Sequence, residues 1–194
     1  AEASQGTLQV MYEFQSLVCQ LLGMEVANAG MYDGPTSLAE AALMACRVTR
    51  RNRVAVVDTV SPRYVEVLRL YTEAQGIQVD TVPLRDAVLP ADTAALLVQH
   101  PNFFGYLEDL GHLGELAHKQ AALFVVSVDP IAMGMFPPPG EYVADIATAE
   151  AQPLGVPLSF GGPYAGLFAT RMSYLRQMPG RIVGRTKDRE GRPG

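Results

Sequence analysis

The sequence predicts an α/β fold in which a mainly parallel sheet is flanked by helices. Short apolar, β-branched runs alternate with longer segments whose apolar residues recur at helical spacing. Alternation at these lengths is typical of βαβ units, which place helices on both faces of the sheet. Ligands of such sheets lie beyond the carboxyl ends of the strands, so the loops that follow Ala29, Asp58, Gln99 and Val128 are the first places to look for a site.

The first helix and the strand after it are marked by a change in apolar spacing. Residues 7–22 place apolar side chains at helical intervals, and Gly23 is a natural end for that helix. Residues 24–29 predict a short strand. After a Gly-Pro turn, an Ala-rich helix is expected over 37–50, and the β-branched run 53–58 predicts a buried strand.

The middle of the chain continues the alternation. A Ser-Pro pair, with Ser as N-cap and Pro in the first turn, begins a helix expected over 61–75. Period-two spacing predicts a strand over 77–82, and apolar runs predict strands over 94–99 and 123–128. Between these last two strands, residues 107–119 have helical spacing.

The end of the chain is read as two further strands, over 142–147 and 166–170, and a short helix over 172–178. No internal repeat or low-complexity linker divides the chain, so we expect one domain over residues 1–180 and a polar tail over 181–194. The chain starts without Met, and its last residues are polar and complete no predicted helix or strand. We therefore expect an internal segment of a longer polypeptide.

Composition and charge argue against several classes of protein. Apolar residues make up 48% and charged residues 18%, which rules out disorder over most of the chain. The net charge of −5 argues against nucleic acid or an anionic membrane surface as the main partner. Two cysteines in 194 residues fit a reducing, cytoplasmic compartment, and the longest apolar run is too short to span a bilayer.

The turn before the second predicted helix, residues 32–37, could bind a phosphate. Free backbone N–H groups at a helix start favour an anion, and the hydroxyls of Thr36 or Ser37 would help. The simpler interpretation is a helix cap with Thr36 or Ser37 at the N-cap. The sequence favours the cap, because the Asp33 carboxylate would repel a phosphate and the specific nucleotide-binding signatures are absent.

Two strand ends carry polar side chains. The amide of Asn102 could bind a ligand oxygen, or the run through Gly105 could form a strand-ending turn with an aromatic plug, and the two readings weigh about equally. Asp129 follows the strand over 123–128. It could pair with a cationic ring nitrogen of a cofactor, pair with an arginine, or cap the next turn, and the cap is the favoured interpretation.

A glycine-rich segment lies between the last two predicted strands. Gly161, Gly162 and Gly166 indicate close backbone approach to another chain or to a ligand, although a glycine-rich hairpin would use the same residues. A Gly-Gly-Pro run flanked by aromatic residues is uncommon, so this segment is more specific than the other candidates.

Metal-binding signatures are missing, and lysine is scarce. His100, His112 and His118 have no metal-like spacing with carboxylates or thiols, so no metal site is expected. The chain has two lysines, Lys119 at a helix end and Lys187 in the polar tail, and both are expected to be solvated.

The order of these motifs along the chain resembles one protein family. The residues that carry the resemblance are 3–9, 13–15, 22–29, 31–34, 39–42, 101–105, 138–142, 160–166 and 180–184. They resemble the glycine dehydrogenase (decarboxylating) family, the P-protein of the glycine cleavage system, and are closest to subunit 1 of its two-subunit form, which corresponds to the N-terminal half of the single-chain form. Subunits of that family are more than twice as long, so the resemblance implies an internal fragment.

The resemblance implies a fold and a reaction. The fold would be the large domain of the aspartate-aminotransferase-like (fold type I) class of pyridoxal-phosphate enzymes, partial here, with the tail leading to a further C-terminal part. The reaction would be decarboxylation of glycine with transfer of its aminomethyl group to the lipoyl arm of the H-protein, for which pyridoxal phosphate is the electron sink.

One departure from the family pattern is central. In the catalytic partner, subunit 2, a His-Lys pair precedes a glycine-rich loop, whereas the matching stretch here contains Gln152 and Pro153. Neither Lys119 nor Lys187 is placed to substitute. The resemblance therefore implies that the partner binds the cofactor covalently, that this chain binds none, and that the isolated chain is inactive.

Carried over by position, four residues match cofactor contacts of active relatives. Thr36 and Ser37 lie where the phosphate is held, Asn102 matches the amide at the phenolic oxygen, and Asp129 matches the carboxylate at the pyridine nitrogen. Without the lysine, all four are expected to be vestigial. We expect a role at the interface with the partner's active site instead from Ser159, Phe160, Gly161, Gly162 and Pro163.

Two classes of function follow from the resemblance. The first is an enzyme subunit that supports glycine decarboxylation together with subunit 2 and the lipoyl H-protein. The second is a non-catalytic scaffold or regulatory subunit that only assembles the partner and docks the H-protein. An independent pyridoxal-phosphate enzyme of another specificity is disfavoured by the missing lysine.

Overall fold

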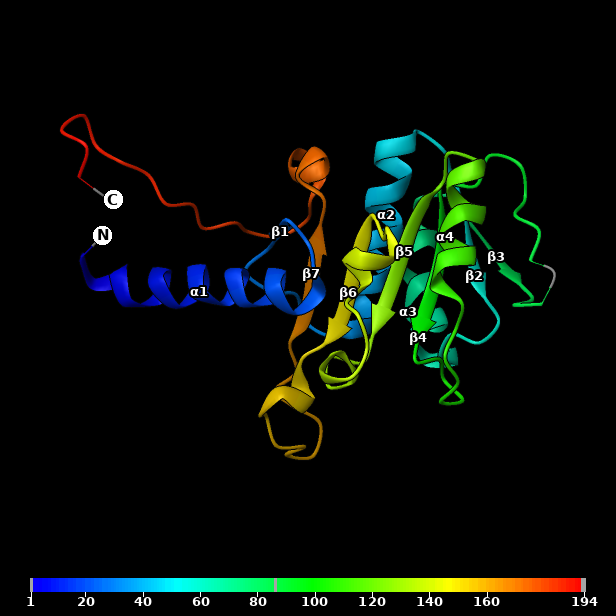
Figure 1. The fold of residues 1–194 in the computed structure, drawn as a ribbon, viewed down its shortest axis with the longest axis horizontal. Helices are drawn as coiled ribbons and strands as arrows, with labels where there is room; N and C mark the ends of the chain where they lie inside the picture. Colours follow the sequence, from blue (N-terminus) through cyan, green and yellow to red (C-terminus); the bar gives the residue numbers. More distant parts are fainter. Residues whose placement is uncertain (1, 86, 193–194) are drawn as a thin grey trace.

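The computed structural model describes residues 2–85 and 87–192 as helices on both faces of one sheet (Figure 1). The longer helices are α1 (Gln5–Leu22), α2 (Gly34–Thr49), α3 (Pro62–Glu73) and α4 (Leu110–Lys119). The strands are β1 (Val26–Ala27), β2 (Arg53–Val57), β3 (Gln78–Val82), β4 (Ala95–His100), β5 (Leu123–Val128), β6 (Ile146–Glu150) and β7 (Gly166–Thr170). The 3₁₀ helices are Glu2–Ser4, Ala132–Gly134, Pro139–Tyr142, Gln152–Leu154 and Met172–Gln177.

The sheet has seven strands in the order β1-β7-β6-β5-β4-β2-β3. The five strands from β6 to β3 are parallel neighbours, and the register sets Leu97 of β4 beside Val125 of β5. Strand β7 runs antiparallel both to β6 and to β1. The predicted α/β fold with a mainly parallel sheet is confirmed, with an antiparallel strand near one edge.

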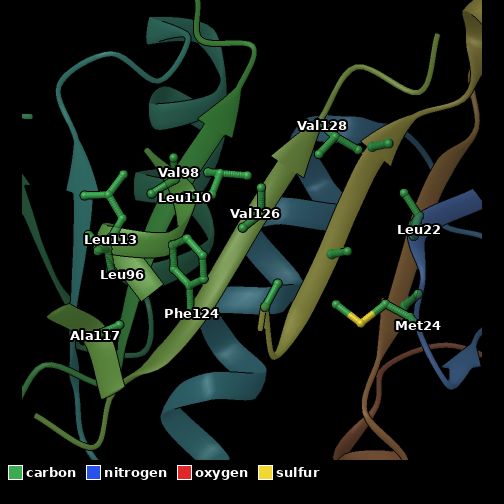
Figure 2. Packing of buried hydrophobic residues seen from close by; sticks show 14 of the residues in the cluster. Leu22, Met24, Leu96, Val98, Leu110, Leu113, Ala117, Phe124, Val126 and Val128 are labelled. Carbon is green, nitrogen blue, oxygen red and sulfur yellow. The ribbon is translucent and has the colours of Figure 1, made fainter. Parts of the chain in front are cut away.

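Helices cover both faces of the sheet. Helices α2 and α3 cover one face, where Met44 packs in a cluster with Phe168 of β7. Helices α1 and α4 cover the other, where Phe124 of β5 packs with Leu113 of α4 and Leu22 of α1 belongs to the same cluster (Figure 2). Burial on both sides explains why β4 and β5 are nearly continuous apolar runs instead of alternating ones.

The strand predicted over 24–29 is wrong in its length, since only the two residues of β1 pair in the sheet. Met24 belongs to the turn that ends α1, because its N–H donates to a carbonyl of the last helical turn. After β1, the side-chain oxygen of Asn28 accepts a hydrogen bond from the Gly30 N–H at 3.0 Å. This local side-chain bond turns the chain out of the sheet.

The strand predicted over 142–147 is displaced along the chain. The 3₁₀ helix Pro139–Tyr142 lies where the strand was expected to start, and Val143 has a left-handed backbone with a φ of 55°. Strand β6 starts later, after Asp145, whose carboxylate accepts a hydrogen bond from the Phe124 N–H at 2.8 Å. A left-handed residue cannot belong to a regular strand, which is why the apolar pattern misleads here.

Helix ends differ from the predictions in detail. The helix predicted over 107–119 begins later, because Asp109 caps it by accepting a hydrogen bond from a first-turn N–H. The short helix predicted over 172–178 is a 3₁₀ helix and ends one residue earlier, at Gln177. Ser61 precedes α3 as expected, but its side chain makes no capping bond; its N–H donates to Gln99 Oε1 at 2.8 Å.

Helix α1 extends beyond the sheet, and the C-terminal tail runs beside it (Figure 1). Gln15 joins the two segments: its Nε2 donates to the Val183 carbonyl at 3.0 Å, and its Oε1 accepts from the Val183 N–H at 2.9 Å. The predicted tail, residues 181–194, is thus anchored near its start, and its residues 193–194 lie outside the described residues. Among the described helices, none is both long and apolar enough to cross a membrane.

Candidate functional site

Asp33 caps the N-terminus of α2. Its Oδ1 accepts a hydrogen bond from the Thr36 N–H at 2.8 Å, while Thr36 Oγ1 accepts from the Asp33 N–H at 3.2 Å, which is a capping box. The Ser37 hydroxyl donates to the Asp33 carbonyl at 2.7 Å. The helix predicted over 37–50 therefore starts earlier, at Gly34, and neither Thr36 nor Ser37 is the N-cap. The Gly-Pro pair lies in the first helical turn, where proline is well tolerated.

A second carboxylate closes the same helix end. Glu150, the last residue of β6, accepts a hydrogen bond from the Gly34 N–H through Oε2 at 2.9 Å. Its Oε1 accepts from the Gln152 N–H at 2.9 Å and from the Ala165 N–H at 3.2 Å. The sequence interpretation missed Glu150; the available signal was a charged residue at the carboxyl end of an apolar strand, which needs partners.

The phenol of Tyr64 lies against this helix end. A Cβ placed on Gly34 would be closer than 3.0 Å to the Tyr64 hydroxyl and 3.2 Å from the Glu150 backbone nitrogen, so an added side chain would have to displace the phenol. Burial, followed by the nearby charges of Glu150, Asp33 and Asp129, raises the pKa of Tyr64 to about 12. Tyr64 is therefore a neutral phenol on the helix α3 side of a group of carboxylates.

For the glycine-rich segment, the prediction was close backbone approach to another chain or to a ligand; the close approach in the structure is at Gly166 and is to helix α2 of the same chain. A Cβ there would lie closer than 3.0 Å to Ser37 Oγ and to the Asp33 carbonyl oxygen. Gly161 has no other atom within 4 Å of such a Cβ, and Gly162 has only a backbone nitrogen at 3.9 Å. Their φ values of 113° and 151° still favour glycine.

Asn102 is bound within its own loop. Its Oδ1 accepts from the N–H groups of Phe104 at 2.9 Å and Tyr106 at 3.0 Å, and its Nδ2 donates to Glu108 Oε1 at 2.7 Å. Glu108 also accepts from the Thr59 hydroxyl at 2.8 Å. Of the two readings of Asn102, the geometry is that of a strand-ending turn, but the aromatic side chains of Phe103 and Phe104 are exposed and form no plug.

His100 lies under this loop. Its side chain is buried, and its Nδ1 accepts a hydrogen bond from the Glu108 N–H at 3.2 Å, which assigns the proton of the neutral ring to Nε2. Burial lowers the pKa of His100, while the negative charge of Glu108 acts in the opposite direction. Both the burial and the hydrogen bond to Nδ1 therefore favour the neutral form of the imidazole.

Asp129 is exposed at the end of β5. Its Oδ1 accepts a hydrogen bond from the Ile131 N–H at 2.9 Å, which is the capping role favoured from the sequence. Among the residues that the structure describes, Asp129 forms no ion pair with an arginine.

The segment between β6 and β7, residues 151–165, projects beyond the carboxyl ends of the parallel strands (Figure 1). We call it the β6–β7 segment. Because β6 and β7 are antiparallel, it is the connection of a hairpin. The side chain of Phe160 is fully exposed, and beside the segment an open apolar hollow of about 770 Å³ is lined in part by Leu17 of α1 and Leu154. The remaining expected loop residues are also at the surface: Ser159, Gly161 and Pro163 are exposed, and Gly162 is half-buried.

The residues present do not fit the pyridoxal phosphate that the resemblance implies. The first N–H groups of α2 are bonded to Glu150 and Asp33, whose charges would repel a phosphate. The amide of Asn102 is bonded within its own loop. The helix end and its two carboxylates thus form a closed polar cluster, and the amide of Asn102 is satisfied in a separate loop.

The two lysines lie away from this cluster. Lys119 is exposed at the end of α4, with its Nζ 3.8 Å from Glu115 Oε2, and Lys187 is exposed in the tail. Gln152 and Pro153, which the resemblance aligns with a His-Lys pair, belong to the 3₁₀ helix Gln152–Leu154 that follows β6. Over residues 2–85 and 87–192, no three His, Cys, Asp or Glu side chains converge as metal ligands.

Comparison with known proteins relates this chain to one family. The family described as glycine cleavage system P-protein matches residues 1–194. Probable glycine dehydrogenase (decarboxylating) subunit 1 of Desulforamulus reducens is 52% identical over 100% of this chain, and that of Desulfitobacterium hafniense is 50% identical over 100%. The chain covers 45% of each, so it spans less than half the length of these relatives.

Solved structures agree with the sequence comparison. A crystal structure of glycine decarboxylase (P-protein) of the glycine cleavage system, in inhibitor-bound form, superposes with a TM-score of 0.94 at 48% identity, over 100% of this chain and 45% of that one. A putative O-acetylhomoserine (thiol)-lyase from Campylobacter jejuni has a TM-score of 0.69 at 11% identity, over 86% of this chain and 41% of that one, and shares the fold alone. The predicted fold type I class is confirmed. On the match over its whole length, the chain belongs to the glycine cleavage system P-protein family.

Proposed function

We propose that this chain is part of subunit 1 of a glycine decarboxylase. It would support pyridoxal-phosphate-dependent glycine decarboxylation and aminomethyl transfer to the lipoyl H-protein, in the cytoplasm. The names of relatives about half identical over the whole chain support the reaction. The single observation that carries the division of labour is the α2 N-terminus, where Asp33 and Glu150 take the N–H groups that a phosphate would need.

On this proposal, subunit 2 binds the cofactor covalently, and this chain contributes a contact surface at the interface between the two subunits. The β6–β7 segment is the candidate for that contact. The fully exposed side chain of Phe160 lacks the cover that an aromatic ring of its size usually has, and the apolar hollow beside the segment is open. Thr36, Ser37, Asn102 and Asp129 then serve the local structure of this chain.

The test uses the full-length subunit co-expressed with subunit 2 and mixed with lipoyl H-protein and glycine. We expect release of carbon dioxide from glycine by the pair and not by this subunit alone. Borohydride reduction should attach the cofactor to a lysine peptide of subunit 2. Attachment to Lys119 or Lys187 would contradict the proposed division of labour.

The scaffold function remains the second candidate, because the closed cluster is compatible with a subunit that contributes no residue to the reaction. Phe160→Ala separates the two, with Leu70→Ala as a matched control on the exposed surface of α3. An interface role next to the active site predicts a lower rate per assembled complex for Phe160→Ala alone. A pure scaffold predicts fewer complexes with an unchanged rate in each.

A further inference from the structure

The carboxylate of Glu150 joins three separate parts of the chain. Its two oxygens accept three backbone hydrogen bonds, from the N–H groups of Gly34, Gln152 and Ala165. These donors belong to the first turn of α2, to the start of the β6–β7 segment and to its end. One half-buried side chain therefore fixes both ends of an exposed segment to a helix end.

The arrangement is chemically that of an anion site. A helix N-terminus carries partial positive charge, and hydrogen bonds from backbone N–H groups to an ionised acceptor are roughly twice as strong as neutral ones. Because Gly34 and Gly166 have no Cβ, the first turn of α2 packs close to the end of the sheet, where Glu150 is the last residue of β6. The anion in this site is part of the chain itself.

Besides the bonds to Glu150, the ends of the β6–β7 segment are held by the pairing of Glu150 with Gly166 in the sheet and by the packing of Ala151 and Ala165 against the core cluster. One backbone bond, from the Ala151 N–H to the Ala165 carbonyl at 2.7 Å, closes its base. Its tip is exposed, and Ser159 and Phe160 have positive φ values of 39° and 54°. The orientation of the tip therefore depends on how firmly its two ends are fixed, and both ends are bonded to Glu150 Oε1.

We propose that Glu150 is an internal anion that takes the place of a bound phosphate at the N-terminus of α2, and that the same carboxylate is a positioning residue for the β6–β7 segment. The part that concerns catalysis rests on the proposed function, because it needs the segment to lie beside the partner's active site. The part that concerns the anion site does not depend on it.

The experiment compares Glu150→Ala, Glu150→Gln and the control Glu115→Ala in the full-length subunit bound to its partner. Glu115 is an exposed glutamate of α4 whose only ion pair, among the described residues, is with Lys119. Hydrogen exchange is measured on peptides that contain residues 34, 152 and 165. Each sample is measured in chloride and in the same ionic strength of acetate or of inorganic phosphate.

We expect exchange at all three sites to rise at least about tenfold in Glu150→Ala, because three charge-assisted bonds are lost together. Acetate should slow it again, because its carboxylate can occupy the site that the side chain leaves beside Asp33; phosphate should slow it less, because the Asp33 carboxylate repels the larger negative charge. Glu150→Gln, which keeps the shape but not the charge, should be intermediate and insensitive to both anions. Glu115→Ala should match the unmodified complex.

Unchanged exchange in Glu150→Ala, or faster exchange that no anion slows, would overturn the internal anion. If Glu150→Ala does not assemble, Glu150→Gln carries the test, and exchange equal to the unmodified complex would overturn the proposal. The glycine decarboxylation rate is measured in parallel. A complex without any such activity refutes the proposed function, whereas the exchange data still decide the anion site.

Discussion

Replacing Gly166 by Ala should test the closeness of β7 to the helix end directly. The added Cβ would meet Ser37 Oγ and the Asp33 carbonyl oxygen at less than 3.0 Å, a distance that real Cβ atoms essentially never show. The backbone must move, and the paired bonds between Met31 and Gly166, both 2.9 Å, would break. Overpacking costs about 1–3 kcal/mol and each lost hydrogen bond about 1 kcal/mol, so we expect a loss of about 3–5 kcal/mol in the free energy of unfolding.

Urea unfolding followed by circular dichroism measures this loss. Gly184→Ala is the control, because no atom lies within 4 Å of a Cβ there, and it should change stability by less than about 0.5 kcal/mol. Adding Ser37→Ala to Gly166→Ala removes one of the two close contacts, while the Asp33 carbonyl stays. The double variant should therefore recover part of the loss and not all of it. A loss below about 1 kcal/mol for Gly166→Ala would refute the reasoning.

Three further predictions concern the core and the buried titratable groups. Phe124→Ala, at a fully buried ring, should cost about 3–5 kcal/mol in urea unfolding, whereas Phe104→Ala, at an exposed ring, should cost under about 0.5 kcal/mol. Because folding lowers the pKa of His100, protonation of its ring favours the unfolded state. The contribution of His100 to the free energy of unfolding should therefore be complete above a pH of about 6.5 and be lost below it. His100→Gln should flatten that part of the pH profile. Burial raises the pKa of Cys46 to about 11, so in a Cys19→Ser background iodoacetamide should label Cys46 at pH 8 about a hundredfold more slowly than a free thiol.

The sheet was predictable because its central strands are buried on both faces. A strand covered on both sides must be apolar throughout, so the runs that became β4 and β5 stand out in the sequence. The ends of the sheet were not predictable in the same way. Whether 24–29 or 142–147 continues as a strand depends on side-chain bonds of Asn28 and on the left-handed backbone of Val143, which apolar spacing does not encode.

The sequence predicted where the candidate residues lie on the sheet, but it did not predict which residues they are hydrogen-bonded to. The loops after the strands are where Asn102 and Asp129 lie, as the topology required. The partners of these residues could not be read from the sequence, because Asn102 pairs with Glu108 and the helix end pairs with Glu150, which is far from it in the chain. A single sequence shows which residues need partners and leaves open which ones they find.

The paired bonds between Gln15 and Val183 have a consequence for how the chain folds. The two residues are 168 positions apart, and β1 likewise pairs with β7, so some contacts of the N-terminal segment form only with residues near the other end of the described chain. During synthesis, α1 and β1 leave the ribosome before β7, and β1 cannot pair until β7 has emerged. Until then β1 and the part of α1 that contacts the tail lack these partners, so association with other chains or with chaperones can compete with folding in that interval.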